Sequence, residues 1–256
     1  MAVPAPAAVG TRRERLRGQT TAEIKHVARE QMAREGTASV SLRQIAAAMG
    51  MTAPALYRYY ASRDDLLTAL IADSYTALAD AIEAAANAPA AGDYAARMLA
   101  GMLAFREWAI MYPTEFALIY GSPIPGYNAP EEETGPAAAR PGALYISLMH
   151  DAWRTGMLTL PPTPTDHSPA LVAQLGVWQA EHDYDAPPAI LYLTLVSWTA
   201  MYGMIAAEVF GHSGEIVRDP GAFYRAEMIT LLARMGLHVP PDDAMPSEGG
   251  VPTTDV

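Results

Sequence analysis

The chain has 256 residues, of which 51% are hydrophobic and 18% charged, enough for a sizeable core in one large domain or two smaller ones. It contains no cysteine, which excludes a disulfide framework, a thiolate nucleophile and a cysteine-based zinc site. Its net charge of −11 is uneven, because residues 1–64 carry ten Lys/Arg and five Asp/Glu, a net of +5, and the remainder carries −16.

This charge asymmetry predicts that only the N-terminal part contacts a polyanion, with random scatter of charges as the alternative. Residues 1–18 are predicted to form a disordered basic arm. Their apolar, proline-containing stretch precedes Arg12, Arg13, Arg15 and Arg17, and a secretory signal has the opposite order. A cytoplasmic protein is therefore expected.

Three helix starts follow, and each carries a hydroxyl residue with a Glu, Gln or Asp three positions later, as in a capping box. They are Thr20-Thr-Ala-Glu23, Ser41-Leu-Arg-Gln44 and Ser62-Arg-Asp-Asp65. The apolar spacing predicts helices over 20–35, 42–49 and 62–86, and a short helix that begins near Ala53. Gly36 and Gly50 end the first two helices.

The rest of the chain also has helical periodicity. Helices are expected over about 94–112, 113–120, 142–155, 169–182, 189–210 and 220–236, with Gly/Pro-rich loops at 121–141 and 159–169 and a disordered tail at 238–256. No stretch alternates as a strand does, so the predicted fold is all-α. The eighteen uncharged residues from Ile190 to Ala207 meet the minimum length of a membrane span. Thr, Ser and Gly dilute them, so a helix buried on all sides, including by a partner subunit, is expected rather than a membrane span.

The segment from Ser41 to Arg63 has the layout of a helix-turn-helix DNA reader. The first turn of its second helix, Thr52-Ala-Pro-Ala55, is small enough to approach base edges and contact thymine methyl groups. Tyr57 and Tyr59 flank Arg58 and can offer hydroxyls to the DNA backbone, Arg63 can hold a phosphate, and Arg43 can reach a guanine edge. We expect DNA contacts from Ser41, Arg43, Thr52, Ala53, Pro54, Ala55, Tyr57, Arg58, Tyr59 and Arg63. A buried helical hairpin with solvated arginines is the alternative.

Residues 20–70 resemble the DNA-binding domain of the tetracycline-repressor (TetR) family of bacterial regulators. The stretch Gly50–Leu67 fits that family's signature without a gap. The resemblance implies that Arg43 and residues 52–55 and 58 face bases, that Tyr57, Tyr59 and Arg63 hold phosphates, and that Leu56 and Tyr60 are core. Tyr59, Tyr60 and Arg63 stand where histidine, phenylalanine and lysine are common. The expected organisation is a three-helix DNA-binding domain at 19–64 and a larger helical ligand-binding and dimerisation domain at 65–237.

The C-terminal part is similar to a subgroup of this family through Phe105–Tyr127 and through a later Trp…His-Gly motif. That motif reads Trp198-Thr-Ala-Met-Tyr202-Gly203 here, so the role of the histidine is not carried over. The resemblance implies that the helices at 189–210 and 220–236 pair with those of a second subunit.

Aromatic and methionine side chains are dense between residues 94 and 210, and their spacing places several on shared helical faces. Core packing is one interpretation, and a pocket for an apolar or aromatic ligand is the other. The candidate ligand-binding residues are Met102, Phe105, Trp108, Tyr145, Met149, Trp153, Trp178, Trp198 and Tyr202.

The sequence thus predicts a homodimeric repressor that a small apolar or aromatic ligand releases from a palindromic operator. A DNA-binding dimer without an effector, whose body is a protein-interaction module, is the alternative. An all-helical enzyme has no support, because no P-loop, G-x-G-x-x-G or G-x-S-x-G motif is present. No metal or cofactor is expected, since His150-Asp151 and His182-Asp183 are adjacent pairs whose side chains diverge on a helix.

Overall fold

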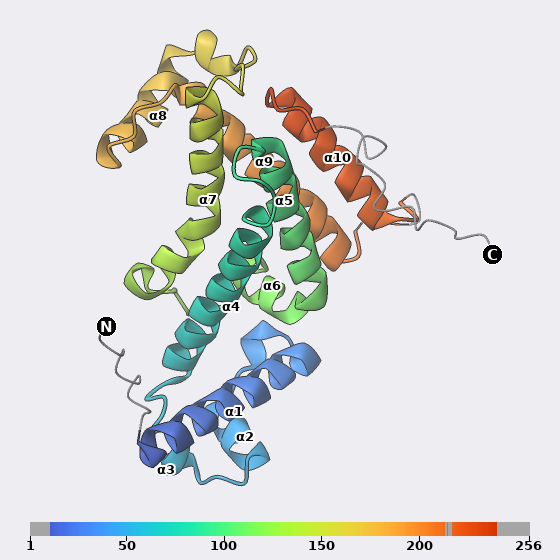
Figure 1. Ribbon diagram of the computed structural model, residues 1–256. Coiled ribbons are helices and arrows are strands. Elements are labelled where there is room, and N and C mark those ends of the chain that lie inside the picture. Colours follow the sequence, from blue (N-terminus) through green and yellow to red (C-terminus); the bar gives the residue numbers. More distant parts are fainter. Residues whose placement is uncertain (1–10, 213, 215–216, 240–256) are drawn as a thin grey trace, which may run out of the picture. The chain divides into compact units, whose positions relative to one another are not determined.

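The computed structural model describes residues 11–212, 214 and 217–239, and in this part of the chain it contains helices and no strand (Figure 1). The all-α prediction is therefore confirmed. The α-helices are α1 (Arg12–Glu35), α2 (Leu42–Ala48), α3 (Ala53–Leu56), α4 (Arg63–Ala86), α5 (Tyr94–Met111), α6 (Pro113–Tyr120), α7 (Glu131–Arg154), α8 (Pro169–Glu181), α9 (Pro188–Val209) and α10 (Pro220–Arg234). Two short 3-10 helices, η1 (Thr37–Ser39) and η2 (Pro164–Asp166), lie between them.

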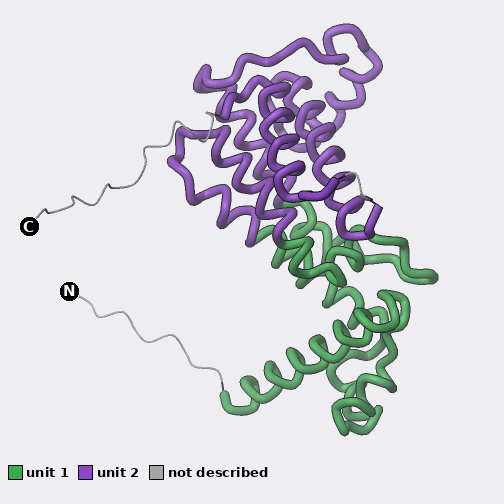
Figure 2. Tube along the Cα trace, turned by 90° about the vertical axis from the view of Figure 1, so that its right-hand side faces the viewer, with its two compact units in different colours: residues 1–80, 108–140 green, residues 81–107, 141–256 purple. Residues whose placement is uncertain are grey.

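The chain forms two compact units (Figure 2). Unit 1 comprises residues 1–80 and 108–140, and unit 2 comprises residues 81–107 and 141–256. This division differs from the predicted boundary after residue 64. The beginning of α4 and residues 108–140 belong with the N-terminal helices, because Leu66, Leu118 and Ile124 are buried in the same core as Leu56.

The core of unit 1 joins the three N-terminal helices to α4. It contains Ile24, Ala28 and Met32 from α1, Leu42, Ile45 and Ala46 from α2, Leu56 from α3, and Leu66, Leu67, Leu70 and Ile71 from α4. Burial of one such side chain contributes about 1.5–3 kcal/mol. The apolar periodicity of the sequence predicted these inward faces correctly.

Helix α1 begins earlier than predicted. Thr11 and Glu14 form a capping box, in which the Thr11 amide donates to Glu14 Oε2 at 2.6 Å and the Glu14 amide donates to Thr11 Oγ1 at 3.3 Å. Thr20 and Thr21 lie inside the helix, where their hydroxyls donate to the carbonyls of Leu16 and Arg17. Residues 12–18 are thus helical rather than a disordered arm, and residues 1–10 lie outside the described part.

The two other predicted caps behave differently. At the start of α4, the Asp65 amide donates to Ser62 Oγ at 3.1 Å and the Ser62 amide donates to Asp65 Oδ2 at 3.0 Å, as predicted. The Ser41 side chain makes no cap hydrogen bond. Gln44 instead accepts from the buried amide of Gln31, which also donates to the Ser39 carbonyl and so fixes the approach to α2.

The loop predicted at 121–141 is shorter than expected, because α7 begins at Glu131 and not near residue 142. Three glutamates in its first turn interact favourably with the helix dipole. The amide and hydroxyl of Thr134 both donate to the Pro130 carbonyl. These interactions and a run of alanines outweigh the prolines and glycines on which the loop prediction was based.

Unit 2 contains the long apolar helix α9, which packs against α8 and α10. Its buried stripe comprises Ala189, Ile190, Leu191, Thr194, Ser197, Met201 and Ile205. By length and composition α9 could also cross a membrane, a test that core helices of soluble proteins pass as well. Asp219 caps α10 by accepting from the Ala222 amide at 2.9 Å, with Pro220 at the first helical position, as predicted. The predicted tail at 238–256 falls almost wholly on undescribed residues.

Replacing Ser62 with alanine should lower the free energy of unfolding by about 0.5–2 kcal/mol, because the Asp65 amide loses its acceptor. The matched change Ser41→Ala should cost less than about 0.5 kcal/mol, because Ser41 makes no cap bond. Urea denaturation followed by circular dichroism measures both. Equal losses in the two variants would contradict this difference between the caps.

Candidate nucleic-acid interface and adjoining cleft

The helix-turn-helix is built from α2, a glycine turn and α3. Gly50 has φ of +65°, the left-handed conformation that glycine adopts without strain. The Met51 amide donates to the Ala46 carbonyl at 2.8 Å and the Gly50 amide donates to Ala47 at 3.2 Å, which is a Schellman motif. This motif ends α2 and directs the chain into α3.

Two residues anchor α3 to the core of unit 1. Leu56 is fully buried and Tyr60 is 8% exposed, as predicted for both. Burial raises the pKa of Tyr60, with a smaller contribution from the Asp73 carboxylate, so its phenol stays neutral. These anchors fix which side of the short helix faces solvent.

The outer side of α2 and α3 carries most of the predicted DNA contacts. Arg43, Thr52, Pro54, Tyr57 and Arg58 are exposed, and Ser41, Ala53, Ala55 and Tyr59 are half-buried. α3 itself is short, and the chain continues through turns to Tyr60, whose amide donates to the Leu56 carbonyl at 3.3 Å. The result is a small first turn followed by an aromatic and basic segment, as the sequence predicted.

Arg63 takes a position that the sequence did not predict. Its Nε donates to the Val40 carbonyl at 3.1 Å and its Nη2 donates to the Ala38 carbonyl at 3.0 Å. These bonds tie the start of α4 to the segment before α2. They use Nε and Nη2, two of the donors that the predicted phosphate contact could also use.

Arg17 contacts one of the predicted DNA-contact residues, and the sequence did not predict this contact. Its guanidinium carbon lies 5.6 Å from the centre of the Tyr59 ring, within the range of a cation–π contact. The sequence signal was the arginine cluster at 12–17, which was assigned to a disordered arm. Since this segment is helical, the cluster lies beside a predicted phosphate-binding tyrosine.

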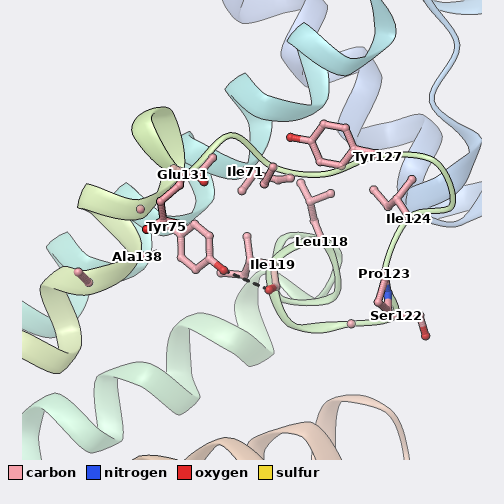
Figure 3. A pocket seen from close by; sticks show the side chains of 15 residues that line it. Ile71, Tyr75, Leu118, Ile119, Ser122, Pro123, Ile124, Tyr127, Glu131 and Ala138 are labelled. Carbon is pink, nitrogen blue, oxygen red and sulfur yellow. Dashed lines mark hydrogen bonds between the residues drawn. The ribbon is translucent and has the colours of Figure 1, made fainter. Parts of the chain in front are cut away.

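Unit 1 also contains an open cleft of about 600 Å³ between α4, the end of α6 with the loop after it, and the start of α7 (Figure 3). Its apolar lining includes Ile71, Leu118, Ile119, Pro123 and Ile124. Three of these, Ile71, Leu118 and Ile124, also belong to the core that holds the helix-turn-helix. The cleft therefore borders the core on which the helix-turn-helix packs.

Hydroxyl groups and one carboxylate supply the polarity of the cleft. Tyr127 and Thr68 share a hydrogen bond of 2.8 Å. Tyr75 donates to the Ile119 carbonyl at 3.3 Å (Figure 3). The pKa of Tyr75 is raised by burial and further by the carboxylate of Glu131, and burial likewise raises the pKa of Tyr127. Both tyrosines thus present neutral hydroxyls to the cleft.

None of the nine residues predicted to bind a ligand lines this cleft. Trp108 belongs to unit 1 and contacts Tyr112 at 5.8 Å between ring centres. The other eight lie in unit 2. Met102, Phe105 and Met149 are fully buried there, and Phe105 stacks on Trp198 at 5.2 Å. For these side chains the packing favours a role in the core.

Trp153 and Trp178 belong to a second aromatic group in unit 2, which His150, His182 and Tyr184 complete. The ring centre of Tyr184 lies 5.5 Å from that of His150 and 5.8 Å from that of Trp178. The ring centres of His150 and Trp153 are 6.1 Å apart. Burial, and then the nearby Asp151, raise the pKa of Tyr184 to about 12. The sequence placed the two tryptophans on helices but could not show that a loop tyrosine joins them.

Comparison with known proteins gives the family. Residues 24–70 match the family "Bacterial regulatory proteins, tetR family", and residues 98–231 match "Tetracyclin repressor-like, C-terminal domain". The chain is 34% identical over 235 residues to the HTH-type transcriptional regulator Rv1816 of Mycobacterium tuberculosis, which covers 90% of this chain and 97% of the relative. The chain belongs to the TetR family. It is accordingly a helix-turn-helix transcriptional regulator and not an enzyme.

Solved structures agree with this assignment. The crystal structure of SCO4313 is 35% identical, with a TM-score of 0.72 over 87% of this chain and all of the other. A TetR-family regulatory protein from Rhodococcus RHA1 shares the fold at a TM-score of 0.59, with 16% identity over 86% of this chain and 99% of the other. Members of the TetR family bind DNA operators and are typically dimers.

Proposed function

We propose that this TetR-family regulator is a homodimeric repressor that leaves a palindromic operator when a small molecule occupies the cleft of unit 1. One observation carries the proposal: the cleft and the helix-turn-helix are built on one core, through Ile71, Leu118 and Ile124. The cytoplasm is the expected location of such a regulator.

Binding to the operator is assigned to the exposed side of α2 and α3. Arg43 reaches a guanine edge bidentately, and residues 52–55 with Arg58 follow the major groove. Tyr57 and Tyr59 donate hydrogen bonds to phosphates, and Ser41 at the start of α2 adds a further contact. Arg63 holds the start of α4 to the segment before α2. The exposure of Arg43, Tyr57 and Arg58 supports this assignment.

Dimerisation is assigned to α9 and α10. On α9 the apolar side chains of Leu195 and Val196 are 60% and 43% exposed, and on α10 Phe223 is 48% exposed. Small residues continue both faces, with Thr199 and Gly203 on α9 and Ala226 on α10 all exposed. Such faces fit a symmetric four-helix interface, and two readers then occupy half-sites one helical turn apart, roughly 34–36 Å.

The effector is assigned to the cleft, whose volume of about 600 Å³ suits a small ligand. The lining carries several apolar side chains, the hydroxyls of Tyr75 and Tyr127, and one carboxylate, that of Glu131. This lining favours a neutral or cationic molecule with an apolar body and a hydrogen-bonding group. A ligand changes DNA affinity only if it binds the two conformations unequally, and the shared core supplies that link.

A cleft of this size argues against the alternative of a DNA-binding dimer without an effector. The aromatic side chains of unit 2 remain a second candidate ligand site, centred on Trp153, Trp178 and Tyr184. Selecting bound sequences from random DNA, with and without a metabolite panel, tests the proposed function as a whole. Failure to enrich any sequence would contradict it.

On the selected operator, Arg43→Ala should reduce sequence discrimination by about 1–3 kcal/mol at one position of each half-site, because a bidentate base contact is lost. Tyr57→Phe should weaken binding to all sequences alike. Tyr112→Phe removes a similarly exposed hydroxyl outside the reader and should change neither. Fluorescence anisotropy with operator and scrambled duplexes measures these effects. If both reader variants bind like the parent, the assigned face is wrong.

The change Leu195→Glu should convert the dimer to monomers, because it places two buried charges in the symmetric interface. Met157→Glu, at a side chain that is 65% exposed elsewhere in unit 2, is the matched control and should leave the dimer intact. Sedimentation velocity gives the oligomeric state. A dimeric L195E protein would exclude this face as the interface.

The change Ala138→Trp should fill part of the cleft and abolish release from DNA by any compound that releases the parent, with operator affinity retained. Ala137→Trp adds the same side chain one position earlier on α7, at a residue that does not line the cleft. Anisotropy titrations with the active compounds compare the variants. An equal response of A138W and the parent would place the effector elsewhere, and the aromatic group of unit 2 would be tested next.

A further inference from the structure

The first two turns of α1 extend beyond the helices against which the rest of α1 packs. Residues 12–19 are all exposed, and the first buried side chain of α1 is Ile24. The family match also begins at residue 24. This segment, residues 12–19, is named the arginine arm here, and it lies outside the part that defines the family's DNA-binding domain.

Helical register gives the arm two different sides. With 3.6 residues per turn, Arg13 and Arg17 lie on the same stripe of α1 as the buried residues Ile24, Ala28 and Gln31. The stripe is buried and mainly apolar where α1 packs on its neighbours, and basic and exposed where it continues past them. Arg15 lies on nearly the opposite side of the helix.

The contact between Arg17 and Tyr59 shows where this basic stripe leads. The Arg17 guanidinium lies over the Tyr59 ring, 5.6 Å from its centre. Arg13 is one turn further out, about 6 Å along the helix axis. The stripe therefore continues outward from the tyrosine to which a phosphate contact is assigned.

The charges of the arm are not balanced within the described part of the chain. Arg12, Arg13, Arg15 and Arg17 form no ion pair there, whereas Lys25 and Arg29 pair with Asp73, and Arg140 pairs with Asp80. The carboxylate of Glu14 accepts from the Thr11 amide in the capping box. Cations near a helix N-terminus also oppose the helix dipole. The arm thus concentrates positive charge at the N-terminus of α1, where the helix dipole makes positive charge unfavourable for folding.

We propose that the arginine arm contacts the phosphate backbone of double-stranded DNA beside the reader, through Arg13 and Arg17. The partner is the DNA duplex itself, because the stripe ends at Tyr59 on the reader. The arm lengthens the footprint on each half-site by phosphate contacts and leaves the base sequence that is read unchanged. This inference deepens the proposed DNA-binding function and rests on it.

The test compares Arg13→Gln with Arg15→Gln, two exposed arginines on opposite sides of the same arm. Binding of labelled duplexes is measured over a range of salt concentrations, with both the selected operator and mixed-sequence DNA. A plot of log K against log salt has a negative slope, and each lost phosphate contact reduces the magnitude of that slope by about 0.9. A dimer carries two arms, so we expect the magnitude of the slope to fall by about 1.8 for R13Q on both duplexes with unchanged sequence preference, and R15Q to match the parent.

The helical form of the arm is tested separately. Thr11→Ala removes the acceptor of the Glu14 amide without changing charge, so the arm frays and the salt slope falls toward that of R13Q. Thr11→Ser keeps the cap and should behave as the parent. Circular dichroism checks that all variants remain folded.

Equal slopes for R13Q, R15Q and the parent would overturn the arm while leaving the proposed reader intact. Equal losses in R13Q and R15Q would show a diffuse charge effect and also overturn the assigned stripe. If the parent enriches no sequence, the proposed function fails, and the slopes on mixed-sequence DNA still decide the arm.

Discussion

A helix of four residues is not stable by itself in water, so the recognition helix α3 depends on the burial of Leu56. The core that receives this side chain is completed by Leu66, Leu67 and Leu70 of α4 and by Leu118 after them. The helix-turn-helix therefore has no separate core, because the core that holds it extends past α3 into α4 and beyond. Its geometry is set by side chains as far along the chain as residue 124.

This dependence gives the cleft its importance. A ligand that displaced Ile71, Leu118 or Ile124 would act on the side chains that position α3, with no long chain of contacts between the two. Tyr127 adds a polar link, since it shares a hydrogen bond with Thr68 of α4. A close-packed core responds to a change of volume at any part of its boundary, and one part of this boundary lines the cleft.

The buried faces of long periodic helices were predictable from the sequence. The choice between two similar capping sequences at one helix start was not. The inward faces of α1, α2 and α4, the anchors Leu56 and Tyr60, and the Ser62–Asp65 cap follow from spacing and residue type. The start of α1 was misplaced because two similar capping sequences, at Thr11 and Thr20, compete for one helix, and the first of them caps it.

The candidate site shows the same limit. The exposure of Arg43, Tyr57 and Arg58 was predictable because their neighbours Leu42, Ile45, Ala46 and Leu56 were expected to face the core. The hydrogen bonds of Arg63 were not predictable, since its carbonyl partners, Ala38 and Val40, lie more than twenty residues away. The cleft could not be foreseen either, because its lining combines α4 with a loop and the start of α7, and only the folded chain brings them together.

The capping box of Thr11 and Glu14 has a consequence for the cost of ordering the chain. Fixing the backbone of one residue costs about 1–2 kcal/mol in conformational entropy, so a disordered arm of several residues loses much of its binding energy when DNA orders it. The Thr11–Glu14 hydrogen bonds pre-form the first turns of α1 before any partner is present. Arginines held on such a helix meet the duplex with their backbone already in place, and only their side chains have freedom left to lose.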